Sequence, residues 1–225
     1  MPLQGSAILC VWNDADPALE DEFNEWYLRQ HALERVGIPG INRARRYRAV
    51  ADGAPRYAAF YEADTLDVLR SETYVRLLDE PTPWTRRMMP AFRNMQRGIC
   101  SVVASLGEGI GGAASFWHLS PTPGEEARLR AWLCETVLPP IMRLPGIVAA
   151  HVWEGVAAAS ARPTTEVALR GGADRGVELV LVVEAQEQGA LDRLRPPFRA
   201  HEPAEQGAAH VDTYPGYSLL VAFGG

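Results

Sequence analysis

One phrase occurs twice in this chain, and the repetition constrains its fold more than any other feature. Residues 22–41 read EFNEWYLRQHALERVGIPGI, and residues 130–147 read RAWLCETVLPPIMRLPGI. An offset of 106 residues superimposes further pairs in the same order: Pro17 on Pro123, Trp26 on Trp132, Pro39-Gly40 on Pro145-Gly146, and Phe92-Arg93 on Phe198-Arg199. Repetition at a fixed offset indicates a repeated structural unit. We therefore expect two copies, residues 1–108 and residues 109–225.

Each copy predicts the same succession of elements. In the first, residues 7–12 form an apolar strand, a helix begins at Asp16-Pro17 and ends before Pro39-Gly40, and residues 41–50 and 56–63 form a hairpin. A helix at 66–78, a proline-rich excursion and a strand at 98–106 follow. The second copy repeats this order with strands near 113–120, 147–156, 176–185 and 217–223 and a longer loop around 163–176, which moves the match of Glu62-Ala63 to Glu184-Ala185. The order is β-α-β-β-α-β, twice.

That order is the ferredoxin-like unit, in which helices cover one face of a four-stranded sheet. The bare face must be covered, and two such sheets packed face to face cover each other. We predict an α+β fold of two tandem ferredoxin-like repeats that form a barrel. The glycine-rich segment 107–112 would join them, because it lies between two strands and lacks the following helix that a phosphate-binding loop requires.

Composition excludes several classes of function. The net charge is −6 and all 22 basic residues are arginine, which argues against nucleic acid or an anionic membrane as a partner. The first residues lack the basic start of a signal peptide, and no apolar run reaches the length of a membrane helix. We expect a cytoplasmic protein with reduced cysteines, a small-molecule ligand and possible homo-oligomers. No spacing of the five histidines predicts a metal site.

The first phrase resembles the first helix of the dimeric α/β-barrel superfamily, especially its EthD-like members. These members often show an acidic and aromatic helix, a histidine near its end and Pro-Gly before the second strand. The resemblance implies a single-chain version of a barrel that relatives build from two subunits. Relatives include cofactor-free monooxygenases, muconolactone-type isomerases, polyketide-type cyclases and haem-binding chlorite dismutases, so the fold does not decide the reaction.

His31 is the first candidate catalytic residue. At about 100° per residue, the helix positions expected to face the core are Leu19, Phe23, Trp26 and Leu33. His31 and Tyr27 lie on the flank of that stripe, and their counterparts in the second copy are apolar. An imidazole there could move a proton near neutral pH. The alternative is a histidine that only stabilises the helix end through the helix dipole.

Arg45 and Tyr47 share one face of the second strand, and His151 and Trp153 occupy the corresponding positions of the second copy. Large polar and aromatic groups at both places favour a barrel interior. Arg45 could bind a carboxylate or phenolate, and Tyr47 could donate a hydrogen bond to a developing oxyanion. The alternative is a surface arginine beside a packing tyrosine.

The remaining candidates are predicted ligand contacts. They are Trp12 and Asn13 at the end of the first strand, Tyr27, Tyr61 on the third strand, His118, His151 and Trp153. Asn13 followed by Asp14 is also ordinary turn chemistry. Tyr61 aligns with a valine, which again places the polar groups in the first copy.

Three functions follow. The leading hypothesis is a small-molecule enzyme that needs no tightly bound cofactor and acts on an aromatic or cyclic carbonyl compound. It would act by proton transfer leading to isomerisation, cyclisation or oxygenation, with His31 as acid or base. The second is a haem protein with His118 or His151 as axial ligand, since a haem needs only one histidine. The third is a non-catalytic protein that binds a small ligand.

Overall fold

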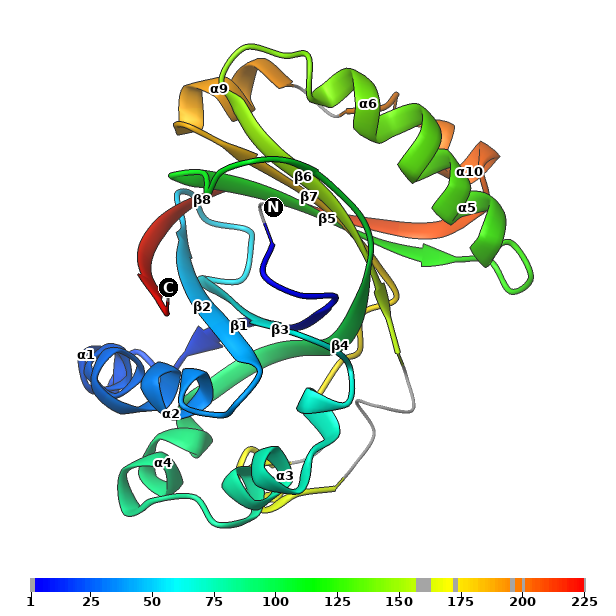
Figure 1. The fold of residues 1–225 in the computed structure, drawn as a ribbon. Helices are drawn as coiled ribbons and strands as arrows, with labels where there is room; N and C mark the ends of the chain where they lie inside the picture. Colours follow the sequence, from blue (N-terminus) through cyan, green and yellow to red (C-terminus); the bar gives the residue numbers. More distant parts are fainter. Residues whose placement is uncertain (1–2, 157–162, 172–173, 195–196, 200, 225) are drawn as a thin grey trace.

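The strands of the computed structural model close into a barrel in the order β1-β3-β2-β8-β5-β7-β6-β4. The structure describes residues 3–156, 163–171, 174–194, 197–199 and 201–224. Every neighbouring pair in the barrel is antiparallel. The helices lie outside the barrel in two groups, one on each side (Figure 1). The predicted α+β class and the face-to-face packing of two ferredoxin-like sheets are confirmed.

The first half runs from β1 to β4. Its elements are β1 Ala7–Ala15, α1 Glu20–Trp26, η1 Tyr27–His31, α2 Ala32–Val36, β2 Ile41–Ala49, β3 Tyr57–Ala63, η2 Val68–Arg70, α3 Glu72–Asp79, α4 Pro83–Met88, η3 Met89–Ala91 and β4 Phe92–Gly107. The second half consists of β5 Ala113–Pro121, α5 Glu126–Trp132, η4 Leu133–Val137, α6 Leu138–Ile141, β6 Ile147–Gly155, α8 Thr165–Leu169, β7 Leu179–Ala185, α9 Gln188–Leu194, α10 Glu202–Glu205 and β8 Ala208–Phe223.

The two halves share their strand register. Ala7 of β1 pairs with Ala63 of β3, and Ala113 of β5 pairs with Ala185 of β7. The pairing of β2 with β3 shifts just after Ile41, and that of β6 with β7 shifts just after Ile147. The predicted match of Glu62-Ala63 to Glu184-Ala185 therefore holds in space.

The predicted match of Phe92-Arg93 to Phe198-Arg199 does not hold in the structure. Phe92 begins β4, whereas Phe198 precedes α10 and the equivalent strand, β8, begins at Ala208. Phe198 instead packs on the outer core of the second half, 5.4 Å from Trp132 between ring centroids. The offset of 106 residues thus aligns the first three elements of each half but not the last strand.

Long strands bind the halves together. The first part of β4 pairs with β1 and its later part pairs with β6, while β8 pairs first with β5 and then with β2. Residues 107–112 join β4 to β5 without an intervening helix, as expected of a connection between the two units.

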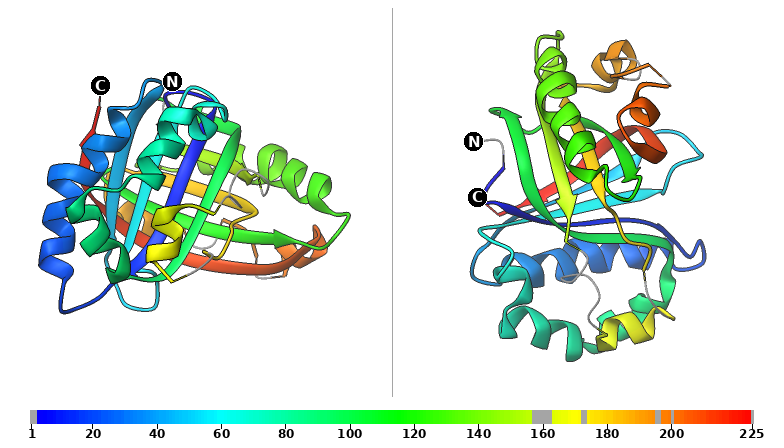
Figure 2. Two further views of the ribbon diagram at one scale, coloured as in Figure 1. Left: turned by 90° about the horizontal axis from the view of Figure 1, so that it is seen from below. Right: turned by 90° about the vertical axis from the view of Figure 1, so that its right-hand side faces the viewer.

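Three apolar cores result. The helices of each half pack on the outer face of their own strands, except α8, which belongs to the second half and packs beside the core of the first (Figure 2). The barrel interior forms the third core, filled largely by aromatic side chains such as Trp12, Phe60, Phe116, Trp153 and Tyr217. Because side chains alternate along a strand, each strand contributes to the interior and to an outer core.

Some element boundaries differ from expectation. The first helix begins at Glu20, because Asp16 Oδ1 accepts a hydrogen bond from the Ala18 amide in a preceding turn. The helix expected over 66–78 is broken at Ser71, whose Oγ caps α3 by accepting from the Tyr74 amide. The proline-rich excursion contains α4 and η3, and β4 begins at Phe92. Among the described residues, no helix has the length and apolar character needed to cross a membrane.

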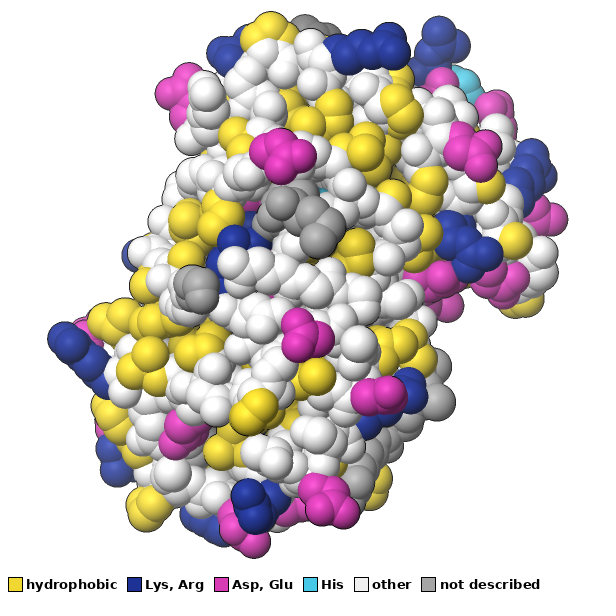
Figure 3. Space-filling model, viewed as in Figure 1, with side chains coloured by type: hydrophobic (Ala, Val, Ile, Leu, Met, Phe, Trp, Pro, Cys, Tyr) yellow, Lys and Arg dark blue, Asp and Glu magenta, His cyan; other side chains and the backbone are white. Residues whose placement is uncertain are grey.

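One face of the molecule is shown with its side chains in Figure 3. Basic and acidic side chains are scattered over this face, with hydrophobic side chains between them. The face carries no large area of a single charge, in keeping with a modest net charge of −6.

Candidate functional site

The helix that carries His31 contains a π-helical turn, η1, at Tyr27–His31. The second half contains the same feature at Leu133–Val137. A π turn adds a residue to the helical repeat and rotates everything after it, and such turns are frequent at functional sites. Our assignment of Leu33 to the core stripe is therefore wrong: Leu33 is 45% exposed, whereas His31 is only 6% exposed. Phe23 and Trp26, which precede the turn, are fully buried as predicted.

His31 faces the outer side of the sheet, among aromatic rings. Its ring centroid lies 4.2 Å from that of Trp26 and 4.8 Å from that of Tyr27. Its Nδ1 atom is buried and forms no hydrogen bond with any described residue. The imidazole projects into the layer between the helix and the sheet.

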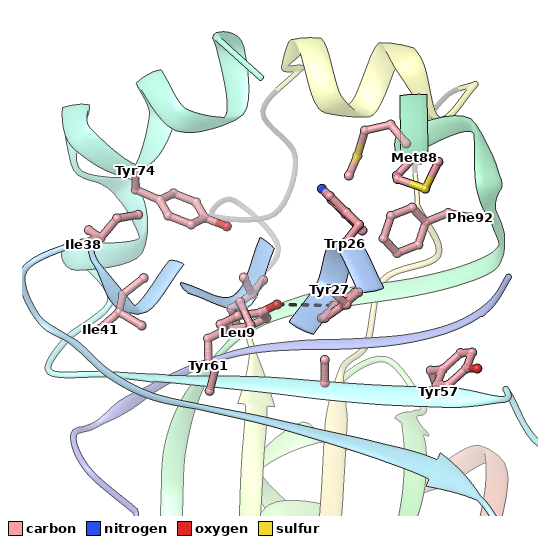
Figure 4. Packing of buried hydrophobic residues seen from close by; sticks show 14 of the residues in the cluster. Leu9, Trp26, Tyr27, Ile38, Ile41, Tyr57, Tyr61, Tyr74, Met88 and Phe92 are labelled. Atoms are coloured by element: carbon pink, nitrogen blue, oxygen red, sulfur yellow. Dashed lines mark hydrogen bonds between the residues drawn. The ribbon is translucent and has the colours of Figure 1, made fainter. Parts of the chain in front are cut away.

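A cavity of about 30 Å³ borders the imidazole. Its wall includes Tyr27, His31 and Arg35 from the first helix, Leu9, Val11 and Tyr61 from the sheet, Tyr74 and Leu78 from α3, Met89, Phe92, Met95 and Arg97 around the start of β4, and Glu166 and Arg170 around α8. The hydroxyl of Tyr61 donates to that of Tyr27 at 3.3 Å (Figure 4). Figure 4 also shows Tyr74 reaching from α3 toward this layer. Three of the predicted site residues, His31, Tyr27 and Tyr61, therefore meet here.

Burial favours the neutral forms of His31, Tyr27 and Tyr61 in this cavity. Burial, reinforced by the positive charges of Arg35, Arg170 and Arg46, holds the pKa of His31 well below its ordinary value. Burial also raises the pKa of Tyr27 and of Tyr61. At neutral pH the site holds an unprotonated imidazole beside two intact phenols.

The second half contributes to this cavity through α8. Arg35 donates to both carboxylate oxygens of Glu166, at 2.7 and 2.8 Å, in a buried ion pair. Arg170 pairs with Asp174 at 2.8 Å. Figure 2 shows α8, coloured yellow, beside α3 and α4 of the first half.

Sequence reasoning missed Glu166 and Arg170, because we treated 163–176 as a longer loop of the second copy, and it missed Arg35, because the partner of Arg35 lies in that segment. The sequence signal that could have revealed α8 was the extra length of residues 163–176, together with a threonine that caps the helix. Thr164 Oγ1 accepts a hydrogen bond from the Val167 amide.

Arg45 and Tyr47 lie in the barrel interior, as predicted, but on the opposite side of the sheet from His31. Arg45 Nη1 lies 2.7 Å from Glu184 and Nε lies 3.0 Å from Glu62, so one guanidinium bridges the two equivalent glutamates of the halves. Arg45 Nη1 also donates to Tyr47 Oη at 3.1 Å. Internal carboxylates thus occupy the place that we assigned to a ligand.

The other predicted contacts are also separated from His31. Trp12 and Trp153 pack in the barrel interior. Asn13 is buried and donates to the Asp14 carbonyl at 2.9 Å, but both residues lie within β1, so the turn considered at Asn13-Asp14 is not formed. These three residues border neither the His31 cavity nor the groove described below.

The two histidines considered for haem do not fit that group. His151 engages both ring nitrogens, Nδ1 with Ser105 Oγ at 2.9 Å and Nε2 with Glu184 at 3.1 Å. His118 keeps Nε2 unpartnered, but its ring centroid lies 4.2 Å from that of Trp12 and 4.8 Å from that of Tyr214. Within the described ranges, no cluster of three metal-ligating side chains is present either.

Comparison with known proteins places the fold. No family model matches the chain, and no curated protein matches it by sequence. Among solved structures, an anthrone oxidase-like protein superimposes with a TM-score of 0.67 at 12% identity, over 96% of this chain and 92% of that one. A protein from Fusobacterium nucleatum that is named a monooxygenase without established activity superimposes with a TM-score of 0.56 at 10% identity, over 99% of this chain and 96% of that one. A mutant chlorite dismutase from Candidatus Nitrospira defluvii superimposes with a TM-score of 0.54 at 10% identity, over 96% of this chain and 92% of that one.

This is the dimeric α/β-barrel fold. The likenesses cover nearly the whole of each chain, so both halves and their arrangement are shared. At such low identity they show the fold alone, and the chemistry of the chain has to be argued from its own residues.

Proposed function

We propose that this protein is a small-molecule enzyme that works without a tightly bound cofactor and moves a proton on an aromatic or cyclic carbonyl compound. His31 would accept the proton. The observation that carries the proposal is the buried, unpartnered Nδ1 of His31 beside two phenols, in one of two otherwise matching π-helical turns. The second turn has Leu133 and Val137 in place of Tyr27 and His31, so it offers no proton acceptor there.

The arrangement suits removal of a proton from a carbon next to a carbonyl group. A neutral imidazole can take that proton directly, because its low pKa leaves it unprotonated. The resulting enolate would accept a hydrogen bond from the hydroxyl of Tyr27, which itself accepts one from Tyr61, and it would lie near the positive charges of Arg35 and Arg170. Preorganised donors and positive charge stabilise the anion more than the neutral ketone, which lowers the barrier to its formation.

The cavity is small for a whole ring compound. At about 30 Å³ it admits a group the size of water. Binding a substrate would require side chains in its wall to move, and Met89 and Met95 are suited to this because methionine is unbranched and adaptable.

The names of the structural neighbours support an aromatic substrate and a later reaction with oxygen. One is called anthrone oxidase-like and another a monooxygenase. We also infer that the halves descend from one duplicated unit, supported by their shared register and matching π turns. The helix phrase of residues 22–41 supports an EthD-like origin for that unit.

Exchange of substrate hydrogen with solvent tests the proton-transfer step directly. The protein is incubated in deuterated buffer with anthrone and with simpler aromatic ring ketones. NMR follows deuterium at the acidic methylene carbon, which in anthrone lies across the central ring from the carbonyl and in the other ketones lies next to it. We expect catalysed exchange with the wild type and a loss of about 100-fold or more in His31→Ala, the usual contribution of a general base. Wild-type rates equal to those of buffer would overturn the proposal for these substrates.

The second half provides a matched control. Val137→Ala removes a buried side chain at the corresponding place of the second π turn. It creates a comparable packing defect without touching the imidazole, so exchange should persist. Equal exchange rates in His31→Ala and Val137→Ala would remove His31 from the mechanism.

A further inference from the structure

Arg46 on β2 carries a buried guanidinium without a bonded carboxylate. Its Cζ lies 4.1 Å from the ring centroid of Tyr27 and 4.3 Å from that of Tyr57, and the residue is 5% exposed. Nε and Nη2 are buried and donate no hydrogen bond. Contact with aromatic faces offsets part of the cost of burying the charge. Burial nevertheless lowers the pKa of Arg46, which indicates that the charge is not fully compensated.

Glu20 is the acidic side chain whose charge acts on Arg46, but its own hydrogen bonds are made with other residues. Its Oε1 accepts a hydrogen bond from Tyr57 Oη at 2.5 Å and another from Arg56. No described residue therefore accepts a hydrogen bond from Nε or Nη2 of Arg46.

A groove of about 260 Å³ borders this guanidinium. It lies where β2 pairs with β8, so one wall comes from each half of the molecule. Figure 1 shows α1 and the C-terminal end of β8 on the same side of the barrel. The lining residues are Asn24, Glu25 and Leu28 on the first helix, Arg46, Arg48, Tyr57, Leu220 and Val221.

The groove combines positive charge with apolar walls. Arg48 is an exposed second cation, and no described carboxylate bonds to it. The one acidic lining residue, Glu25, pairs with Arg29 at 3.4 Å. Leu28, Leu220 and Val221 supply an apolar surface, and Leu220 is half-exposed.

We propose that this groove binds a small aromatic anion, a carboxylate or phenolate on a ring. The charged end accepts hydrogen bonds from Arg46, since a guanidinium matches a carboxylate with paired donors. The ring lies against Leu28 and Leu220. The volume is just under the range for drug-sized ligands, which suits one or two rings. This groove is separate from the His31 cavity, although Arg46 packs on Tyr27, which lines that cavity.

Binding of 2-naphthoate tests the proposal, and its uncharged amide is the matched control ligand. Isothermal titration calorimetry with the full chain should show saturable binding of the acid and at least tenfold weaker binding of the amide. Arg46→Met should weaken binding of the acid at least tenfold, while Arg46→Lys, which keeps the charge but not the fork, should lie between.

A second variant separates loss of binding from loss of fold. Leu220→Asp places a negative charge at a half-exposed position of the groove and should also weaken binding at least tenfold with an unchanged circular dichroism spectrum. Arg128→Gln removes an exposed cation of the second half that does not line the groove, and this variant should bind the acid normally. No binding of the acid by the wild type at millimolar concentration, or binding that both Arg46→Met and Leu220→Asp leave intact, overturns the proposal.

Discussion

Acidification from pH 7 to pH 5.5 should destabilise this protein through two histidines buried in the neutral form. Burial lowers the pKa of His31 well below its ordinary value and that of His118 to about 3. In the unfolded chain both titrate near about 6.5. Below that pH the unfolded state binds protons that the folded state does not, so stability falls as pH falls.

The magnitude follows from linkage. Each histidine that stays neutral on folding lowers the free energy of unfolding by about 1.3 kcal/mol between pH 7 and pH 5.5, and two lower it by about 2.5 kcal/mol. Carboxylates whose pKa is lowered, such as Glu184 at about 2, contribute below this window. Partial burial raises the pKa of Glu34, so protonation of Glu34 on acidification stabilises the folded state and opposes the effect of the histidines.

Urea unfolding at pH 7, 6.5, 6 and 5.5 measures this slope. The double variant His31→Ala/His118→Asn should be less stable at pH 7 but should lose almost no further stability on acidification. His201→Asn alters an exposed ring that is solvated in both states, and it should keep the wild-type slope. A wild-type loss below about 1 kcal/mol over the window, or an equally steep loss in the double variant, would refute burial of neutral imidazoles.

Three further expectations follow from the structure. Glu166→Gln leaves Arg35 buried and unpaired and should cost about 3–5 kcal/mol in urea unfolding, whereas Glu25→Gln, at an exposed pair, should cost less than about 1 kcal/mol. Leu33→Gln should change the free energy of unfolding by less than about 0.5 kcal/mol, because the π turn leaves that side chain half-exposed. A loss of several kcal/mol would show that Leu33 belongs to the core after all. The rate of catalysed hydrogen exchange should stay constant from pH 8 to below pH 6.5, since the neutral form of His31 persists there, and a decline centred at 6.5 would contradict its lowered pKa.

Several features could be predicted from the residues because they depend on local pattern. Alternation along residues 41–47 placed Arg45 and Tyr47 together on the interior face. Pro-Gly before the second strand of each half marked a reversal, and Gly40 and Gly146 adopt φ of 88° and 85°. Repetition of these local signals was enough to predict the order of elements and the barrel.

The site could not be predicted in the same way. An ideal helical repeat put Leu33 inward and His31 on the flank, and only the packed structure reveals the π turn that reverses their burial. Grouping His31 with Arg45 assumed a single pocket, but the sheet separates them.

Sequence alone determined the architecture, because strand alternation, glycine reversals and the order of elements are properties of neighbouring residues. Tertiary structure decided which groups meet. Arg35 pairs with Glu166 from the other half, and Arg45 pairs with Glu184 of the other half as well as with Glu62 on the neighbouring strand β3. Glu166 and Glu184 lie 131 and 139 residues from their arginines along the chain. Three-dimensional packing, and not spacing along the sequence, therefore decides that these arginines bind internal carboxylates.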